Sequence, residues 1–245
     1  MPENIILTAG GTSEPIDRIR SITNTSTGML GRLIARELSK SDKVGRIFYI
    51  HGKKAVMPDC EKVTPVPVES VENLLDAVNK LCSSYKIDAV IHCMAVSDFR
   101  VRSVVSAEML DKKAAGGAFN PKEFFDSENL LSKYNKLPSS SGEPVILLEK
   151  TPKVLPIFRQ LLPDAVIVGF KLLDGVSHEE LIDTAYRLLE KNGCDYVLAN
   201  DYRTVEAGKH EGFLIDGDKK ELHFCGKQEI ARGIAAAVAG GKANE

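Results

Sequence analysis

The stretch from Gly10 to Gly31 constrains the fold of this chain more than any other part. It reads G-G-T-S-E-P-I-D-R-I-R-S-I-T-N-T-S-T-G-M-L-G and lies between the apolar run Ile5–Leu7 and a helical pattern that begins at Leu30. A strand, a polar connection and a helix start form the plan of a phosphate-binding turn in a parallel α/β sheet. The sequence therefore predicts an anion site where this helix begins.

The spacing of the glycines narrows the class of ligand. No G-x-G-x-x-G pattern is present, no G-x-x-x-x-G-K-[ST] pattern lies near this stretch, and the connection is too long for a dinucleotide fingerprint. A ligand other than a nicotinamide is therefore expected. Gly10 and Gly11 would allow a sharp turn at the strand end, while Ser26, Thr27 and Gly28 would present hydroxyls and unpaired backbone N–H groups to an anion.

Charge and hydropathy limit the partners of such a site. The 245 residues carry 32 basic and 34 acidic side chains, a net charge of −2, so no global basic field is available for nucleic acid or an anionic membrane. Phosphate binding must therefore be local. No apolar run approaches the ~20 residues that span a bilayer, and the N-terminus lacks the regions of a secretory signal. A cytoplasmic enzyme or binding protein is expected.

The cysteines favour a reducing compartment. Their number is odd, they show no C-x-x-C spacing, and Cys93 and Cys194 lie in apolar runs where small buried thiols are common. The five are Cys60, Cys82, Cys93, Cys194 and Cys225. Neither a zinc site nor a disulfide framework fits this pattern.

Apolar runs alternate with helical patterns, which predicts a Rossmann-like α/β fold with a doubly wound, mostly parallel sheet. Strands are expected at Ile5–Leu7, Gly45–Ile50, Asp88–Val96, Val145–Glu149, Ala165–Leu172 and Asp195–Asn200. Helices are expected at Leu30–Leu38, Val71–Leu81, Lys122–Tyr134, Pro152–Leu162 with the proline in its first turn, from an N-cap at Ser177 to about Lys191, and at Gln228–Val238. A hairpin is expected at Gly212–Phe224.

A single Rossmann-like domain over residues 1–245 is expected, because no repeat and no clear linker interrupts the chain. Residues 100–144 form its irregular appendage, an insertion or lid region that ends in the breaker-rich loop Lys136–Pro144. Residues 239–245 are expected to be a frayed tail.

Two polar side chains that precede the phosphate turn are candidates for chemistry. Asn24 could donate its amide to a carboxylate, an acyl phosphate or a developing oxyanion without the repulsion of an acidic group. Arg20 is a candidate for binding substrate. Either residue could instead only stabilise its own loop.

The segment Met94–Arg100 follows the third apolar strand and could border a nucleotide. Small residues such as Ala95 would let a planar ring approach the backbone, whose N–H and C=O groups could read its edge. Asp98 could hold Mg²⁺ or a ribose hydroxyl, or could simply cap the following turn.

Four further side chains could meet a nucleotide. Lys136 opens a mobile loop that could deliver it to a phosphate, and Phe170 could stack on a base. Arg187 and Lys191, four residues apart on one helix face, could meet a polyphosphate. The simpler alternatives are a solvated lysine, a core phenylalanine and a pair of surface charges. The five histidines are scattered and predict no catalytic triad.

Six motifs follow one another in an order that is more specific than any of them alone. They are T-A-G-G-T-S-E-P-I-D-R-I-R-S-I-T-N-T-S-T-G-M-L-G, M-A-V-S-D-F-R, K-L-P-S-S, K-T-P-K-V-L, V-G-F-K-L-L and V-L-A-N-D, from about Ile5 to Asp201. This series resembles the phosphopantothenate–cysteine ligase family. Because no flavin-binding decarboxylase domain is recognised, the chain is expected to be the free-standing, monofunctional form of that ligase.

The resemblance implies a homodimer with a modified Rossmann fold and a two-step reaction of coenzyme A biosynthesis. The carboxylate of 4′-phosphopantothenate would attack the α-phosphate of a nucleoside triphosphate and release pyrophosphate. The amine of L-cysteine would then attack the acyl-nucleotide, giving 4′-phosphopantothenoylcysteine and the nucleoside monophosphate. Mg²⁺ would neutralise the triphosphate, and positioning and charge stabilisation would supply most of the catalysis.

The same resemblance implies roles for individual residues. Asn24 would act at the acyl-nucleotide stage, and Lys136 would lie beside the nucleotide, with Leu137–Gly142 as a lid that excludes water. In addition, Ser26–Gly28 would cradle the triphosphate, Met94, Ala95 and Phe170 would border the base, Asp98 would lie near the ribose or the metal, and Arg187 and Lys191 would face the triphosphate.

Departures from the family pattern leave the nucleotide open. Met94 and Ser97 stand where the fused bacterial enzymes commonly have alanines, and Leu137 follows Lys136 where those fusions have a further lysine. CTP is favoured and ATP is the alternative.

Two other functions are alternatives to the ligase. A Rossmann-type NAD(P)-dependent oxidoreductase would need a tighter glycine pattern, an acidic residue at the end of the second strand and a Tyr-x-x-x-Lys pair; none of these is expected here. A nucleotide-binding module without turnover is disfavoured because Asn24 and Lys136 occur together.

Overall fold

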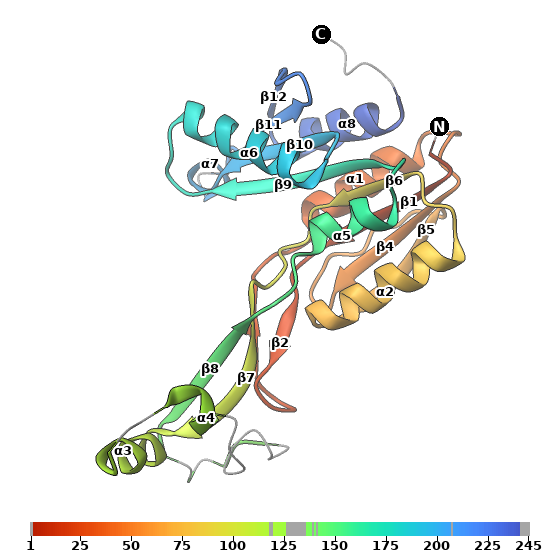
Figure 1. The fold of residues 1–245 in the computed structure, drawn as a ribbon. Helices are drawn as coiled ribbons and strands as arrows, with labels where there is room; N and C mark the ends of the chain where they lie inside the picture. The colour runs from red at the N-terminus through yellow and green to blue at the C-terminus, as the bar shows by residue number, and fades with distance from the viewer. Residues whose placement is uncertain are drawn as a thin grey trace.

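An eight-stranded sheet forms the centre of the protein (Figure 1). The computed structural model describes residues 2–117, 120–125, 136–138, 140, 142–206 and 208–240. In sheet order the strands are β12 (Glu221–Cys225), β11 (Glu211–Asp216), β10 (Tyr196–Asp201), β9 (Val166–Leu173), β6 (Ala89–His92), β1 (Asn4–Ala9), β4 (Arg46–Gly52) and β5 (Val63–Val68). The six strands from β10 to β5 are parallel, whereas β11 and β12 form an antiparallel hairpin. The predicted fold class is confirmed.

Helices cover both faces of the sheet, which explains why its central strands are continuous apolar runs. Ile5, Ile6 and Leu7 of β1 are all fully buried. On one face lie α2 (Val71–Ser84), α5 (Val154–Leu161) and α6 (His178–Asn192), and on the other lie α1 (Met29–Ser39) and α8 (Lys227–Val238). A short helix, α7 (Tyr202–Glu206), follows β10.

Local signals in the sequence set the helix ends. Ser177 caps α6 as predicted, because its hydroxyl accepts a hydrogen bond from the backbone N–H of Glu180 at 3.2 Å. Gly193 ends the same helix in the left-handed region, with φ 61°. By contrast, Pro152 does not lie in the first turn of α5, which begins at Val154.

A small flap interrupts the stretch that was expected to be a plain polar connection. It consists of β2 (Ser13–Pro15) and β3 (Ser21–Thr23), paired antiparallel. Glu14 anchors the flap, because its Oε1 accepts a hydrogen bond at 2.9 Å from the backbone N–H of Val71, the first residue of α2. Burial is the main reason that the pKa of Glu14 is raised.

A two-stranded ribbon extends away from the sheet (Figure 1). It pairs β7 (Phe99–Ser106) with β8 (Pro144–Lys150) and carries α3 (Ala107–Ala115) and α4 (Pro121–Phe125). The region expected to be irregular thus contains regular elements in its described part. The helix expected over Lys122–Tyr134 lies largely outside the described residues, and only α4 overlaps its start.

Two strands differ from those expected from the sequence. The strand expected over Asp88–Val96 ends at His92, because the following residues leave the ladder to enter the site described below. Strand β5, V-T-P-V-P-V, was not expected, since its two prolines remove ladder donors; the structure places it at the edge of the sheet, where such residues are tolerated. No helix among the described residues has the length and apolar character needed to span a bilayer.

Candidate functional site

The strand order reverses between β1 and β6, and the chain leaves both strands at the same edge. In open α/β sheets this switch point forms a crevice for ligands. Beyond β6 the two connections stay in contact, because Gly10 O accepts from Ala95 N at 2.8 Å and Ala95 O accepts from Thr12 N at 3.1 Å. Thr12 Oγ1 continues this contact by accepting from Ser97 N at 2.8 Å.

Asn24, which follows strand β3 of the flap, forms hydrogen bonds with both of these connections. Its backbone N–H donates to Thr12 O at 3.1 Å, and its side-chain Nδ2 donates to Val96 O at 3.0 Å. A Cβ on Gly11 would come within 1.9 Å of the carbonyl oxygen of Asn24, so no larger residue fits at Gly11 without a shift. The predicted residues Gly11, Asn24 and Ala95 are therefore brought together.

The turn before α1 presents its polar groups at the same edge. Gly28 is the N-cap residue and has φ 67°, a conformation that glycine adopts at no steric cost. The hydroxyls of Ser26 and Thr27 accept long contacts of 3.4 Å from the backbone N–H groups of Gly28 and Met29, respectively. These contacts are weak, and the first turn of α1 keeps its partial positive charge toward the crevice.

Two lysines that the sequence reasoning missed border this turn. Lys53 and Lys54 follow β4 and are exposed, and neither makes an ion pair within the described residues. Their turn is fixed against the phosphate turn, because Val56 N donates to Thr27 O at 2.9 Å and a Cβ on Gly28 would meet Ala55 Cβ at 3.0 Å. The sequence could have indicated these lysines, since both directly follow the second strand of the predicted parallel sheet.

Lys136 lies beside the flap rather than in open loop. It is exposed, and the next residue, Leu137, is buried and hydrogen-bonded to the turn between β2 and β3 through Asp17. Arg20 comes from that turn, and its Nη2 lies 3.5 Å from Leu137 O. The structure therefore brings Arg20 beside the residue that follows Lys136; part of the expected lid Leu137–Gly142 lies outside the described residues.

The expected base-binding residues differ in what they can offer. The side chain of Met94 is buried in the core on the α2 side, and its backbone N–H donates to Thr8 Oγ1. The backbone N–H of Ala95 is engaged with Gly10, whereas its C=O accepts one hydrogen bond, from Thr12, and keeps a second lone pair that could meet a base edge. Extending the β6–β9 register by two residues sets Phe170 level with Cys93, on the face covered by α1 and α8.

Asp98 already has a cationic partner. Its Oδ1 lies 2.5 Å from Nζ of Lys153, and both side chains are mostly exposed. Its other carboxylate oxygen makes no hydrogen bond within the described residues. Among the described residues, no group of three or more His, Cys, Asp or Glu side chains is placed to hold a metal. A metal here would therefore need most of its ligands from a bound substrate.

Arg187 and Lys191 are not brought to the crevice. They lie in the second half of α6, which leads away from the carboxyl ends of the strands toward the start of β10. A helix rises 1.5 Å per residue, so Lys191 lies about 20 Å along α6 from its first residue. Arg187 instead lowers the pKa of Asp183, with Lys219 as the main cause of that shift.

Buried titratable groups around the crevice are structural. Nδ1 of His92 lies 2.9 Å from Thr8 Oγ1, and burial lowers the pKa of His92 to about 4. Burial raises the pKa of the Cys93 thiol to about 12, which leaves it protonated and a poor nucleophile. A Tyr-x-x-x-Lys spacing does occur, contrary to expectation, at Tyr49 and Lys53. Tyr49 is fully buried, however, and its hydroxyl donates to Val56 O at 3.0 Å.

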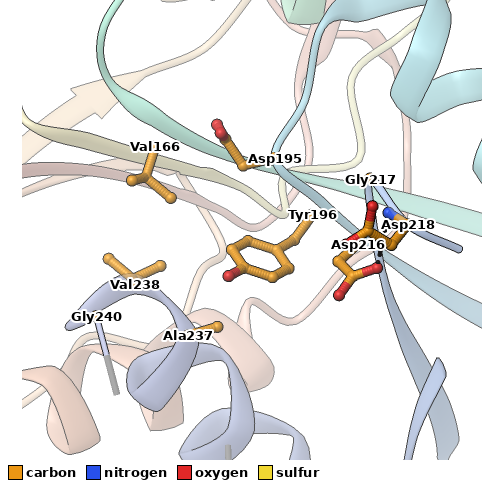
Figure 2. A pocket seen from close by; sticks show the side chains of 9 residues that line it. All are labelled: Val166, Asp195, Tyr196, Asp216, Gly217, Asp218, Ala237, Val238 and Gly240. Atoms are coloured by element: carbon orange, nitrogen blue, oxygen red, sulfur yellow. Dashed lines mark hydrogen bonds between the residues drawn. The ribbon is translucent and has the colours of Figure 1, made fainter. Parts of the chain in front are cut away.

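A cavity of about 390 Å³ lies at the opposite edge of the sheet (Figure 2). Tyr196 lies between the turn of the β11–β12 hairpin and the end of α8, and three carboxylates line the space. They belong to Asp195, Asp216 and Asp218. This acidic lining does not suit an anionic ligand, so the cavity is not part of the crevice site.

Comparison with known proteins places the chain among proteins of pantothenate metabolism. The family model "DNA/pantothenate metabolism flavoprotein C-terminal domain" matches residues 2–120 and 124–241. The coenzyme A biosynthesis bifunctional protein CoaBC of Thermococcus kodakarensis is 32% identical over 94% of this chain and 49% of that protein. The chain spans about half the length of the curated relatives that it matches.

Solved structures agree with this relationship. The DNA/pantothenate metabolism flavoprotein from Streptococcus pneumoniae has 29% identity and a TM-score of 0.84, over 98% of this chain and 99% of that chain. A Cab2 mutant in complex with phosphopantothenate-cysteine has the same fold, with a TM-score of 0.67 at 16% identity over 97% of this chain and 85% of that one.

Proposed function

Because this chain belongs to the family of the DNA/pantothenate metabolism flavoprotein C-terminal domain, we propose that it is a phosphopantothenate–cysteine ligase. The observation that carries this proposal is the crevice at the β1–β6 switch point, where a polar amide and a helix N-terminus lie beside the turn that carries Lys53 and Lys54. Relatives are named for coenzyme A biosynthesis, and one protein of the same fold was solved with phosphopantothenate-cysteine.

The proposed reaction has two steps. A carboxylate oxygen of 4′-phosphopantothenate attacks the α-phosphorus of the nucleotide, the bond from that phosphorus to the bridging oxygen breaks, and pyrophosphate leaves. The cysteine nitrogen then attacks the acyl carbon, the bond to the nucleotide oxygen breaks, and the amine loses a proton. No covalent bond to the protein is needed, so catalysis rests on positioning and charge stabilisation.

Asn24 and the nearby cations have complementary roles in this proposal. One N–H of the Asn24 amide holds Val96 O, and the other remains for the oxyanion that develops as the amine attacks. Lys136 and Arg20 supply positive charge for the transferred phosphate and the anionic substrate. Arg20 contacts the carbonyl oxygen of Leu137, the residue after Lys136, so both cations belong to the region around the flap turn.

The nucleotide is proposed to lie across the start of α1. Ser26, Thr27 and Gly28 face its phosphates, with Lys53 and Lys54 adding charge from the neighbouring turn. Phe170 would border the base together with Met94 and Ala95. We retain CTP as the favoured nucleotide and ATP as the alternative, and we assign no role within one subunit to Arg187 or Lys191.

Mg²⁺ is proposed to enter with the triphosphate. The donor set suits a metal held chiefly by phosphate oxygens, with the free oxygen of Asp98 as its single carboxylate ligand. When bound, the ion would neutralise charge on the leaving pyrophosphate. The ion pair between Asp98 and Lys153 is exposed and therefore weak, so it would yield readily to a divalent cation.

We also propose that the enzyme is a homodimer that works in a reducing compartment such as the cytoplasm, with residues 1–245 acting as one domain. None of the five cysteines is in a disulfide. The ribbon supports a dimer, because a two-stranded sheet on its own is marginally stable and this one exposes the apolar side chains of Phe99 and Leu148.

A pyrophosphate-release assay tests the function. The protein should release pyrophosphate from CTP or ATP only when phosphopantothenate and Mg²⁺ are both present, and product should require cysteine. Replacing Lys136 by Ala should slow pyrophosphate release by about 10²-fold, because it removes the positive charge that would stabilise the transferred phosphate. The control is Lys80→Ala, an exposed lysine on α2. Nucleotide consumption without phosphopantothenate would contradict the assignment.

A further inference from the structure

The side chain of Asp17 is almost completely buried although the residue lies in a surface turn. Its side chain is 1% exposed, whereas that of its neighbour Arg20 is 46% exposed. Oδ1 accepts two hydrogen bonds of 2.8 Å, from the backbone N–H groups of Ile19 and Arg20. One oxygen of the carboxylate therefore shapes the turn between β2 and β3.

The other oxygen reaches a residue 120 positions away. Oδ2 of Asp17 accepts a hydrogen bond of 3.0 Å from the backbone N–H of Leu137. Arg20 contacts the carbonyl of the same residue, with Nη2 at 3.5 Å, and pairs with Asp17 at 3.4 Å. Asp17 therefore binds the N–H of Leu137, and Arg20 contacts its C=O. The N–H that Asp17 binds belongs to the peptide bond between Lys136 and Leu137.

The electrostatics of the turn favour the ionised carboxylate. The hydrogen bond from Leu137 is the largest cause that lowers the pKa of Asp17 to about 2, followed by those from Ile19 and Arg20. The unfolded value is near 3.9, so the interaction is complete above that pH and is lost as the pH falls toward 2. At neutral pH the interaction is a charge-assisted hydrogen bond, which is stronger than one between neutral groups.

We propose that Asp17 is a positioning residue for Lys136: its carboxylate, held by the flap turn, fixes the Lys136–Leu137 peptide against that turn so that the lysine is presented to the nucleotide. This inference rests on the proposed function and extends it to a residue that does not touch substrate. An amide in place of the carboxylate would direct either an N–H group or an uncharged oxygen at Leu137, and would also lose the ion pair with Arg20.

Kinetics of Asp17→Asn separate positioning from general stabilisation. The variant should reduce the rate of pyrophosphate release by about 10- to 100-fold, since a displacement near 1 Å costs that order of rate. In the Lys136→Ala background, however, Asp17→Asn should cause less than a twofold further loss, because the residue acts through that lysine. Asp88→Asn is the matched control: Asp88 also accepts two backbone N–H groups, at the opposite edge of the sheet.

A second measurement does not depend on activity. Trypsin cleaves after lysine, and the peptide bond that it would cleave after Lys136 carries the N–H that Asp17 holds. Mass spectrometry should detect a new N-terminus at Leu137 about 10-fold faster in Asp17→Asn than in the wild type or Asp88→Asn, with the melting temperatures of the three compared.

The outcomes are distinguishable. Equal loss from Asp17→Asn with and without Lys136 would overturn the positioning role, and unchanged cleavage at Leu137 would overturn the contact itself. If the wild type released no pyrophosphate under any condition, the proposed function would fail and the catalytic meaning of Asp17 with it. The cleavage rates would still decide whether Asp17 holds Leu137.

Discussion

Asn24 connects two segments that meet at the switch point, the flap and the connection after β6. Replacing it by Asp keeps the size of the side chain but aims a carboxylate oxygen at Val96 O, 3.0 Å from the present Nδ2. We expect pyrophosphate release to stay within about threefold of the wild type, while attack by cysteine slows by about 10²- to 10³-fold, as when an oxyanion donor is lost. Rapid-quench measurements should then detect the acyl-nucleotide accumulating.

Asn79→Asp, on an exposed position of α2, provides the same chemical change away from the crevice. Normal consumption of cysteine by Asn24→Asp would refute the role given to Asn24. Equal slowing of both steps would indicate instead that the substitution disturbs the crossing of Gly11 and Asn24, where the backbone atoms already lie in contact.

His92 makes stability depend on pH. Its folded pKa, about 4 because of burial, lies below the unfolded value near 6.5, so the unfolded state takes up the proton first as the pH falls. The contribution of neutral His92 to the free energy of unfolding should therefore be fully present above pH 6.5. The free energy of unfolding should fall by roughly 3 kcal/mol between pH 6.5 and 4. Urea unfolding across this range measures how the free energy of unfolding changes with pH. In His92→Gln this dependence should correspond to one proton fewer taken up on unfolding.

Thr8→Val separates burial from hydrogen bonding as the cause of this slope. It removes the hydroxyl that lies 2.9 Å from Nδ1 but leaves His92 enclosed, so the dependence on pH should persist even if overall stability falls. A slope that is unchanged in His92→Gln would show that other groups, such as the partly buried His210, carry the dependence.

At the scale of elements, the sequence was informative wherever one local signal dominated. The apolar runs predicted the central strands, and the family suggested by the motifs is confirmed by the family model. The flap was missed because Ser13–Pro15 and Ser21–Thr23 are each too short to show a period of two. Strand β7, F-R-V-R-S-V-V-S, was missed because arginines interrupt its apolar pattern.

Parts of the site could not be read from sequence for a different reason. The contact of Asp17 with Leu137 spans 120 residues, and no local pattern announces it. The hydrogen bonds of the Ala95 backbone with Gly10 and Thr12 likewise depend on how the connection after β1 meets the connection after β6. The roles given to Asn24, Lys136 and the other site residues stay predictions.

At the scale of the whole molecule, the ribbon extends away from the central sheet (Figure 1). Among the described residues its strands pair only with each other, and Phe99 and Leu148 expose 47% and 41% of their surfaces. A second copy that covered these side chains would remove apolar surface from water and could satisfy an open strand edge.

We therefore expect the charged substitution Leu148→Glu to weaken the proposed dimer by about 10- to 100-fold in Kd, because burying an unpaired carboxylate at an interface is costly. Sedimentation equilibrium over a range of concentrations measures the change. Leu161→Glu, at a residue of α5 that is 40% exposed, is the matched control and should leave the dimer intact. A dimer that is equally stable in both variants would place the contact elsewhere, and a wild type that is monomeric at all concentrations would exclude the homodimer.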